Sequence, residues 1–211
     1  SGPQHTTKDS FIGNTSSIVF DQADDRMEMT GLPTLDGKMF QIDFWAMPGE
    51  FNQGWNDVLG FNTLTGGSRD YFNHYTGAAP DYFELYTGSA AGRDWYCGDD
   101  VQPNRWVHLS IVRDSTTESN IVLYINGKPA TVSSSGTNWD GNITPATHME
   151  LGKRENSSWA YFNEFRYIVD SVDKPQINWT HTQTAGAGNK DAYDVHGWRA
   201  HGHELTDDNA T

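Results

Sequence analysis

The stretch NRWVHLSIVRDSTTESNIVLYINGKPA, residues 104–130, contains the pattern that decides the fold. Apolar and polar residues alternate in each half, and this period of two is typical of a strand with one buried face. The polar run between the halves and the Asn126-Gly127 pair are turn signals. The sequence therefore predicts an antiparallel hairpin that a second sheet must cover. We expect these side chains to be buried between the sheets: Val107, Leu109, Ile111, Ile121, Leu123 and Ile125.

The same alternation recurs along the chain at short intervals. In KMFQIDFWAM (residues 38–47) every second side chain is apolar, and stretches such as DYFELYT and WAYFNEFRYIVD are also strand-like and bounded by turn residues. The chain has 21 glycines, as short connections require, and no long stretch with a helical period. Many short strands separated by turns predict an all-β fold built as an antiparallel sandwich, jelly roll or barrel.

The chain of 211 residues is long enough for one large β domain with a core. We expect an N-terminal segment over residues 1–15, the sandwich over residues 16–179, and a polar C-terminal arm over residues 180–211. The arm is rich in Gly and His and lacks apolar alternation, but it contains three candidate anchors for assembly: Tyr193, Trp198 and Leu205. A tail without contacts, and an arm folded back on its own sandwich, are alternatives to a strap on a neighbouring subunit.

The chain is strongly acidic, with 28 acidic against 14 basic residues and a net charge of −14. This charge repels phosphate backbones and anionic lipid, so we expect no nucleic-acid partner and no membrane insertion. The single cysteine, Cys97, excludes an intrachain disulfide and is expected to be buried. The first ten residues have neither the basic nor the apolar region of a signal peptide.

Four segments in order resemble the laminin G-like, concanavalin A-like lectin/glucanase superfamily. They are SIVFDQADDRMEM, FQIDFWAMP, RWVHLSIVRD with NIVLYINGKPA, and MELGKRENSSWAYFNEFRYI, and they extend over residues 16–169. The resemblance implies a concanavalin A-like jelly roll, an antiparallel β-sandwich, with the C-terminal arm extending from it. It does not imply one function, because this fold carries lectins, hydrolases, adhesion modules and virion proteins.

The hydrolases of this superfamily carry Glu-x-Asp-x-x-Glu on one strand, which supplies the carboxylates of a retaining glycosidase. The matching positions here are Gln41, Asp43 and Ala46, so two of the three carboxylates are missing. Asp43 alone is expected to be a solvated or hydrogen-bonded strand residue. The sequence therefore predicts no catalytic residues and no enzyme activity, and glycoside hydrolase or polysaccharide lyase activity is the least favoured interpretation.

Aromatic residues beside polar ones are the candidate site for a glycan. Sugar rings stack on aromatic faces while polar groups orient the hydroxyls. Three loop-like stretches (GWNDV, RDWYCGDD and NWDGN) supply the predicted glycan-binding residues: Trp55, Asp57, Trp95, Tyr96 and Trp139. Oxygen ligands for Ca²⁺, the one cofactor that the family resemblance suggests, are expected from Asp99, Asp100, Asp140 and Asn142.

The function predicted from these observations is a non-catalytic, lectin-like structural protein. Resemblance to bacteriophage virion proteins of marine type favours a capsid-decoration or tail-associated role at the virion surface. Its partners would be other virion subunits or host-surface glycans, and the protein could form a homo-oligomer. The alternative is an extracellular carbohydrate-binding or adhesion module of a secreted bacterial protein.

Overall fold

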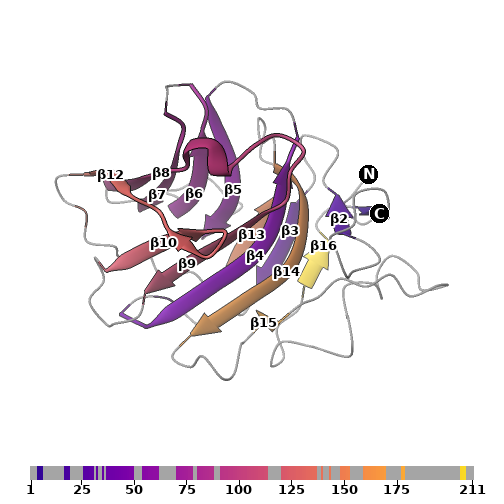
Figure 1. Ribbon diagram of the computed structural model, residues 1–211. Coiled ribbons are helices and arrows are strands. Elements are labelled where there is room, and N and C mark those ends of the chain that lie inside the picture. Colours follow the sequence, from indigo (N-terminus) through magenta and orange to yellow (C-terminus); the bar gives the residue numbers. More distant parts are fainter. Residues whose placement is uncertain are drawn as a thin grey trace.

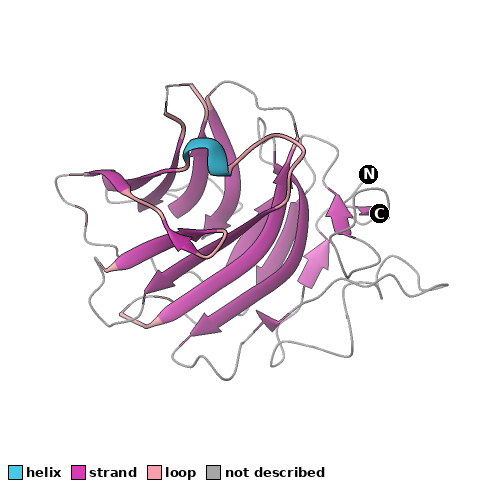
Figure 2. Ribbon diagram, in the orientation of Figure 1, coloured by secondary structure: helices cyan, strands magenta, loops and turns pink. Residues whose placement is uncertain are grey.

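The computed structural model describes residues 4–6, 17–19, 26–30, 32, 35, 37–49, 54–61, 70–77, 80–87, 91–113, 120–136, 139, 143, 148–152, 159–169, 177–178 and 205–207. These residues form two antiparallel sheets and one short 3₁₀ helix, η1 (Gly98–Asp100) (Figure 2). No helix in this part of the chain is long and apolar enough to span a membrane. The prediction of an all-β sandwich is confirmed.

The first sheet, here called the β4 sheet, contains the hairpin predicted from residues 104–130. Figure 1 shows its long strands side by side. Its strands follow the order β1 (Gln4–Thr6), β2 (Ser17–Val19), β14 (Trp159–Val169), β4 (Phe40–Pro48), β9 (Val107–Arg113), β10 (Ile121–Ile125) and β11 (Lys128–Pro129), with β15 (Ile177–Asn178) paired to β14.

The second sheet, here called the β6 sheet, forms the other layer of the sandwich (Figure 1). Its strands follow the order β12 (Val132–Ser135), β8 (Ala91–Tyr96), β7 (Tyr82–Thr87), β6 (Asp70–Tyr75), β5 (Trp55–Phe61), β13 (His148–Gly152), β3 (Arg26–Thr30) and β16 (Leu205–Asp207). Strands β5 to β8 are neighbours both in the chain and in the sheet, so they form an antiparallel meander.

The core lies between the two sheets and is built from their alternate side chains. All six residues predicted from the hairpin are buried, with Leu123 at 0% exposure. They share one cluster with rings from both sheets, including Phe44 packed against Phe162 at 5.9 Å and Phe72 stacked on Phe83 at 5.0 Å between ring centroids. Cys97 is buried in the same cluster, as predicted.

The Asn126-Gly127 turn connects β10 to β11 as the sequence predicts. Both residues have positive φ angles, 51° and 76°, which is the backbone conformation that Asn-Gly favours in a two-residue hairpin. The side-chain oxygen of Asn126 accepts a hydrogen bond from the backbone N–H of His108 at 3.0 Å. The turn is therefore anchored to β9 as well as to its own hairpin.

The described part of the C-terminal arm corrects one expectation. Leu205, a predicted anchor for a neighbouring subunit, lies in β16, which pairs with β3 of the same chain in the register Leu205↔Met29. This part of the arm follows the alternative of an arm folded back on its own sandwich, because β3 offers it an unpaired edge. Tyr193 and Trp198, the other two predicted anchors, lie outside the described residues.

Candidate functional site

The outer face of strands β5 to β8 carries three rows of side chains that run across the strands. Strand alternation sets the face, and the register between neighbours sets the rows. The first row, here called the upper aromatic row, is Trp55, Tyr75, Tyr82 and Tyr96. The second, the polar row, is Asp57, Asn73, Glu84 and Asp94. The third, the lower aromatic row, is Gly60, Tyr71, Tyr86 and Gly92.

A bulge in β5 makes this arrangement possible. The register with β6 shifts between Asp57 and Leu59, so Val58 is the extra residue and is itself buried. Strict alternation would place Asp57 and Leu59 on the same face of the sheet. With the bulge, Asp57 stays on the outer face while Leu59 enters the core, and Gly60 follows on the outer face.

The aromatic rings form a nearly continuous surface. In the upper row, ring centroids are 4.6 Å apart for Trp55 and Tyr75 and 5.1 Å for Tyr75 and Tyr82. The row ends are open to solvent, with Trp55 at 46% and Tyr96 at 43% exposure. In the lower row, Tyr71 and Tyr86 stack at 4.9 Å with an angle of 12° between their planes. The two rows therefore place aromatic rings on both sides of a polar strip.

The polar row between them is rich in hydrogen-bond acceptors. Glu84 and Asp94 are directly opposite each other on neighbouring strands, a placement that is unfavourable for two like charges. Asp94 accepts a hydrogen bond from the hydroxyl of Ser134 on β12 at 2.5 Å. Asn73 is only 3% exposed, and its side-chain oxygen has no hydrogen-bond partner among the described residues. The row therefore holds acceptor oxygens that a ligand with several donors would satisfy.

The acidic groups of this face alter each other's ionisation. Burial, together with the negative charge of Asp94, raises the pKa of Glu84 from 4.5 to about 7. Burial also raises the pKa of Asp94, and the Ser134 hydrogen bond opposes this increase. Burial and the charges of Asp94 and Glu84 raise the pKa of the Tyr82 phenol to about 12. The Glu84 carboxyl is therefore only partly ionised near neutral pH.

Glycines in the lower row leave room for carboxylates. A Cβ atom added to Gly92 would overlap the Glu84 carboxylate, so only glycine permits the observed position of Glu84. A Cβ atom at Gly60 would lie 3.5 Å from the Glu150 carboxylate, which is an ordinary contact. A larger side chain would therefore disturb a neighbouring carboxylate at Gly92 but not at Gly60.

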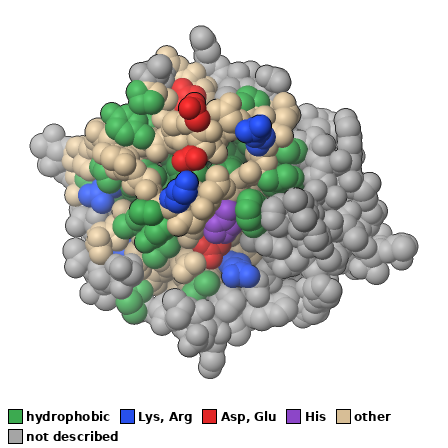
Figure 3. Space-filling model, in the orientation of Figure 1, with side chains coloured by type: hydrophobic (Ala, Val, Ile, Leu, Met, Phe, Trp, Pro, Cys, Tyr) green, Lys and Arg blue, Asp and Glu red, His purple; other side chains and the backbone are tan. Residues whose placement is uncertain are grey.

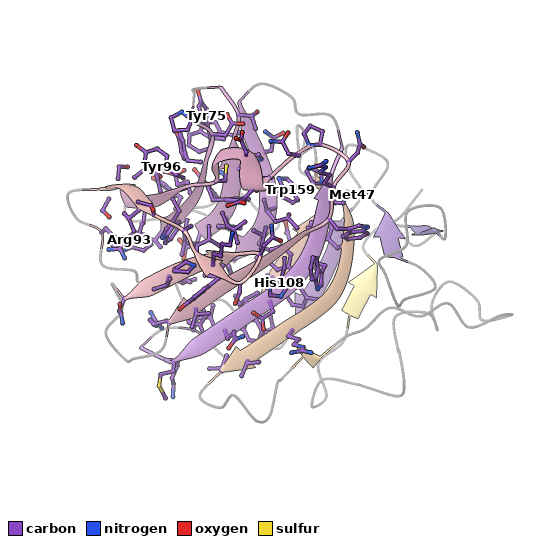
Figure 4. All side chains as sticks on the ribbon, viewed as in Figure 1. Met47, Tyr75, Arg93, Tyr96, His108 and Trp159 are labelled. Atoms are coloured by element: carbon purple, nitrogen blue, oxygen red, sulfur yellow. The ribbon has the colours of Figure 1, made fainter. Side chains whose placement is uncertain are left out.

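The outer face of the β4 sheet has a different character. Here Asp43 is buried and accepts hydrogen bonds from Ser110 at 2.5 Å and from the Gln41 amide at 2.7 Å. Trp45 packs against His108 with their ring centroids 5.1 Å apart. Figures 3 and 4 show the molecule in the same orientation, and Figure 4 labels His108. In Figure 3 the described hydrophobic side chains lie in small groups rather than in one patch. Asp43 is thus a hydrogen-bonded strand residue, as expected.

The structure brings together three of the five predicted glycan-binding residues. Trp55, Asp57 and Tyr96 share the outer face of the β6 sheet, although on strands and not on the loops expected from their sequence context. Trp95 is 1% exposed in the core, which corrects its prediction as a ligand contact. Figure 4 shows Tyr75 and Tyr96 on the β6 sheet, away from His108 on β9.

Trp139, the fifth predicted residue, is not among the three rows. It is partly buried against the core, and the Arg93 guanidinium lies 5.2 Å from its ring centroid. Arg93 also donates a hydrogen bond to the backbone carbonyl of Ile121 across the sandwich at 3.4 Å. The Arg93–Trp139 pair therefore closes the edge of the core between β8 and β10, and we do not include Trp139 in the site.

The predicted calcium ligands fall into two groups. Asp99 and Asp100 lie in η1 and are exposed, while Asp140 and Asn142 lie outside the described residues. Within the described ranges, no three His, Cys, Asp or Glu side chains are grouped so that they could hold a metal ion. A calcium site at these four residues stays a prediction.

Most residues on the outer face of β5 to β8 were not predicted from the sequence as ligand-binding residues. The strands β6 (DYFNHY) and β7 (YFELYT) contribute Tyr71, Tyr75, Tyr82, Tyr86 and Glu84. A signal was present, because each strand has two tyrosines four residues apart, hence on one face, and a buried phenylalanine on the other face. Alternation identifies the outward positions, but the register that aligns them into rows depends on strand pairing across the sheet.

Comparison with known proteins shows where this fold occurs. Residues 21–172 match the family model of the concanavalin A-like lectin/glucanases superfamily. No curated protein sequence matches the chain. Similar solved structures include the heptameric SAP-like pentraxin from Limulus polyphemus, with a TM-score of 0.51, 15% identity, and coverage of 67% of this chain and 68% of that one.

Two further structures have the same fold at low identity. Domain 4 of AbnA, an extracellular arabinanase from Geobacillus stearothermophilus, gives a TM-score of 0.51 with 17% identity, covering 80% of this chain and 75% of that one. Tailspike protein 2 of bacteriophage CBA120 gives 0.57 with 11% identity, covering 81% of this chain but 28% of the tailspike chain. Because the family model covers most of the sandwich, the chain belongs to the concanavalin A-like lectin/glucanase superfamily.

Proposed function

We propose that this protein is a non-catalytic glycan-binding module that uses the outer face of β5 to β8. One observation carries the proposal, namely the two aromatic rows on either side of a polar row on this solvent-accessible face. Apolar faces that stack on sugar rings, with a few fixed polar groups between them, are what carbohydrate recognition requires. Among the proteins of similar fold, the arabinanase domain was solved in complex with arabinotriose.

The site fits a chain of sugars better than a single small molecule. Neighbouring strands lie about 4.8 Å apart, so four strands give a row of about 14 Å. This is the scale of a short oligosaccharide lying across the strands, in contact with successive rings. The terminal residues of the upper row, Trp55 and Tyr96, are also its most exposed members. A longer glycan could therefore enter and leave at either end.

A glycan array tests this proposal directly. The wild-type chain should bind a defined set of oligosaccharides, and Tyr75→Ala, which removes the ring in contact with both Trp55 and Tyr82, should lose that binding. Tyr124→Ala is the matched control, because Tyr124 is a half-buried tyrosine on β10 of the other sheet. Repeating the array with calcium and with a chelator tests the predicted Ca²⁺ dependence. Equal binding by wild type and Tyr75→Ala would contradict the proposal.

We further propose that the module is displayed at a virion surface, as a capsid-decoration or tail-associated protein. A bacteriophage tailspike is among the structures of similar fold, and this supports the proposal at the level of fold alone. Labelling of native phage particles with an antibody raised against the chain should decorate the capsid or the tail. Detection only in the secreted fraction of a bacterial culture would instead favour the extracellular adhesion module.

Glycoside hydrolysis is a second candidate, favoured by the Glu84–Asp94 pair. Cross-strand neighbours place two carboxylates within reach of one bond, and a raised pKa suits a proton donor. Against this, Ser134 holds Asp94 by a hydrogen bond, and the family positions Gln41 and Ala46 lack carboxylates. Oligosaccharides that bind on the array should show no release of reducing sugar. Release that disappears in Glu84→Gln would overturn the non-catalytic proposal.

A further inference from the structure

We propose that the polar row selects glycans carrying protonated amines, such as β-1,4-linked glucosamine oligomers, over neutral and anionic glycans. This inference rests on the proposed function, since it names the ligand class of the same face. It starts from the charge of the outward side chains of β5 to β8. Three of these are carboxylates, on Asp57, Glu84 and Asp94, and none of the twelve positions in the three rows is Lys, Arg or His.

Arg93, the described basic residue next to Asp94 in the chain, does not compensate the negative charge of this face. Arg93 precedes Asp94, and its guanidinium is engaged with the Trp139 ring and with the Ile121 carbonyl of the other sheet. The twelve positions of the three rows therefore supply carboxylates and no cationic side chain to a ligand. Uronic or sialic acid groups would be repelled here, whereas an ammonium group would be attracted.

A second observation points to a ligand with donors and does not depend on charge. Asn73 stands between Asp57 and Glu84 in the polar row, is 3% exposed, and has a side-chain oxygen without a hydrogen-bond partner among the described residues. A buried acceptor left unpaired costs free energy that a bound donor recovers. An ammonium group has three donors and a hydroxyl has one, so the ammonium better satisfies a row of acceptors.

The aromatic rows favour the same ligand chemistry. Ammonium groups are attracted to the faces of Tyr and Trp rings, and sugar rings stack on those faces. The polar row runs between the two aromatic rows along its length, so a bound amino sugar would meet rings and carboxylates together. The direct pairing of Glu84 with Asp94 is unfavourable without a ligand, and a bound cation would relieve this repulsion.

Calorimetry with two matched oligomers tests the inference on the chain of 211 residues. The glucosamine hexamer and its N-acetylated counterpart differ only in the charge and acetylation of their amines. We expect the glucosamine hexamer to bind about tenfold tighter at about pH 6, as one charge-assisted hydrogen bond allows. The ratio should approach one in Asp94→Asn, which keeps the shape of the side chain. Because the pKa of Glu84 is about 7, this carboxyl is mostly protonated at about pH 6, and Glu84→Gln should change the ratio less.

A control separates local contacts from net charge. Met39→Lys adds one positive charge at an exposed position next to β4 on the other sheet, so it changes the net charge as much as Asp94→Asn does. It should leave the ratio between the two hexamers unchanged. A hexalysine peptide should bind more weakly than the glucosamine hexamer, because it has no sugar rings to stack.

The outcomes distinguish this inference from the proposed function. Equal affinity for both hexamers, or tighter binding of the N-acetylated one, overturns the amine inference and leaves glycan binding intact. Hexalysine binding as tight as the glucosamine hexamer overturns it too, since the face would then recognise clustered ammonium groups of any origin. If neither hexamer nor any array glycan binds, both proposals fail. Circular dichroism of each variant confirms that lost selectivity is not lost folding.

Discussion

At the scale of single residues, Glu84 is the group whose protonation reports on the site. Its pKa is raised from 4.5 to about 7, so the folded protein holds this proton more tightly than the unfolded chain does. The stability contributed by Glu84 is therefore full below about pH 4.5 and is lost as the pH rises through about 7. Burial is the larger cause of this shift, and the negative charge of Asp94 adds to it.

Glu84→Gln should remove this part of the pH dependence. The variant should gain stability relative to wild type at about pH 8, where the wild-type carboxylates repel each other, and should differ little at about pH 4. Urea unfolding of both proteins at the two pH values measures the difference. A variant less stable than wild type at the higher pH would show that the Glu84 charge stabilises the fold, contrary to our description of the pair.

His74 in the core should have the opposite dependence. It is fully buried, packs against Phe83 and Trp159, and its Nε2 is 3.5 Å from the Cys97 sulfur. Burial lowers the pKa of His74 from 6.5 to about 4, so the unfolded chain binds this proton more tightly. Stability from His74 is present above pH 6.5 and is lost as the pH falls toward 4.

We expect the stability of His74→Gln to depend less on pH than that of wild type under acidic conditions. The substitution should cost stability at about pH 7, because ring packing is lost, yet its stability should fall less than that of wild type between about pH 6.5 and 4. Thermal unfolding monitored by circular dichroism across this range provides the measurement. Parallel pH profiles for the two proteins would be inconsistent with a neutral, buried imidazole.

At the scale of elements, the two glycines of the lower aromatic row make a matched pair of probes. Gly92→Ala places a methyl group against the Glu84 carboxylate, whereas Gly60→Ala meets Glu150 at ordinary contact distance. Gly92→Ala should therefore displace Glu84 and weaken glycan binding, while Gly60→Ala should retain it. Calorimetry with the best array glycan measures both. Equal effects of the two substitutions would contradict the described position of Glu84.

The β9–β10 hairpin is the element that most directly tests the core. Leu123 is fully buried between the sheets, so Leu123→Ala should reduce the free energy of unfolding by about 2–5 kcal/mol. Val122→Ala is the control, since Val122 is half-buried and faces away from the core on the same strand. Its cost should be below about 1 kcal/mol. A smaller cost at Leu123 than at Val122 would place the wrong face of β10 in the core.

How much the sequence could predict also differs between elements. The pairing faces of β9 and β10 and the turn from β10 to β11 were predictable, because alternation fixes which face is buried and Asn-Gly favours a two-residue turn. Trp95 and Tyr96 were both predicted to bind a glycan, but Trp95 is buried in the core and only Tyr96 is exposed. Two adjacent aromatic residues in a strand cannot both lie on the outer face. The bulge at Val58 also limits prediction, because it shifts the alternation of β5 without a sequence signal of its own.

At the scale of the whole molecule, β16, the described part of the C-terminal arm, lies in the same sheet as the candidate site but apart from it. β16 pairs with β3, and β13 separates β3 from β5, the first strand of the site. Deleting residues 180–211 should therefore leave glycan affinity unchanged. The deletion exposes the edge of β3, and an exposed edge promotes pairing with other chains.

Sedimentation velocity should accordingly show more self-association for the shortened protein than for the full chain. Calorimetry of the same two samples compares their glycan affinities. A shortened protein that stays as monodisperse as the full chain would mean that β16 does not protect this edge. If assembly into particles also depends on the arm, the shortened protein should fail to incorporate although its sandwich is folded.

The central claim is that the outer face of β5 to β8 binds glycans, and mapping a bound oligosaccharide by NMR tests it most directly. Titration of ¹⁵N-labelled protein with the best array glycan should shift the Trp55 indole N–H signal and the amide signals of β5 to β8. Signals of β9 and β10, on the other sheet, should change little. Shifts concentrated on β9 and β10, with Trp55 unaffected, would contradict the account.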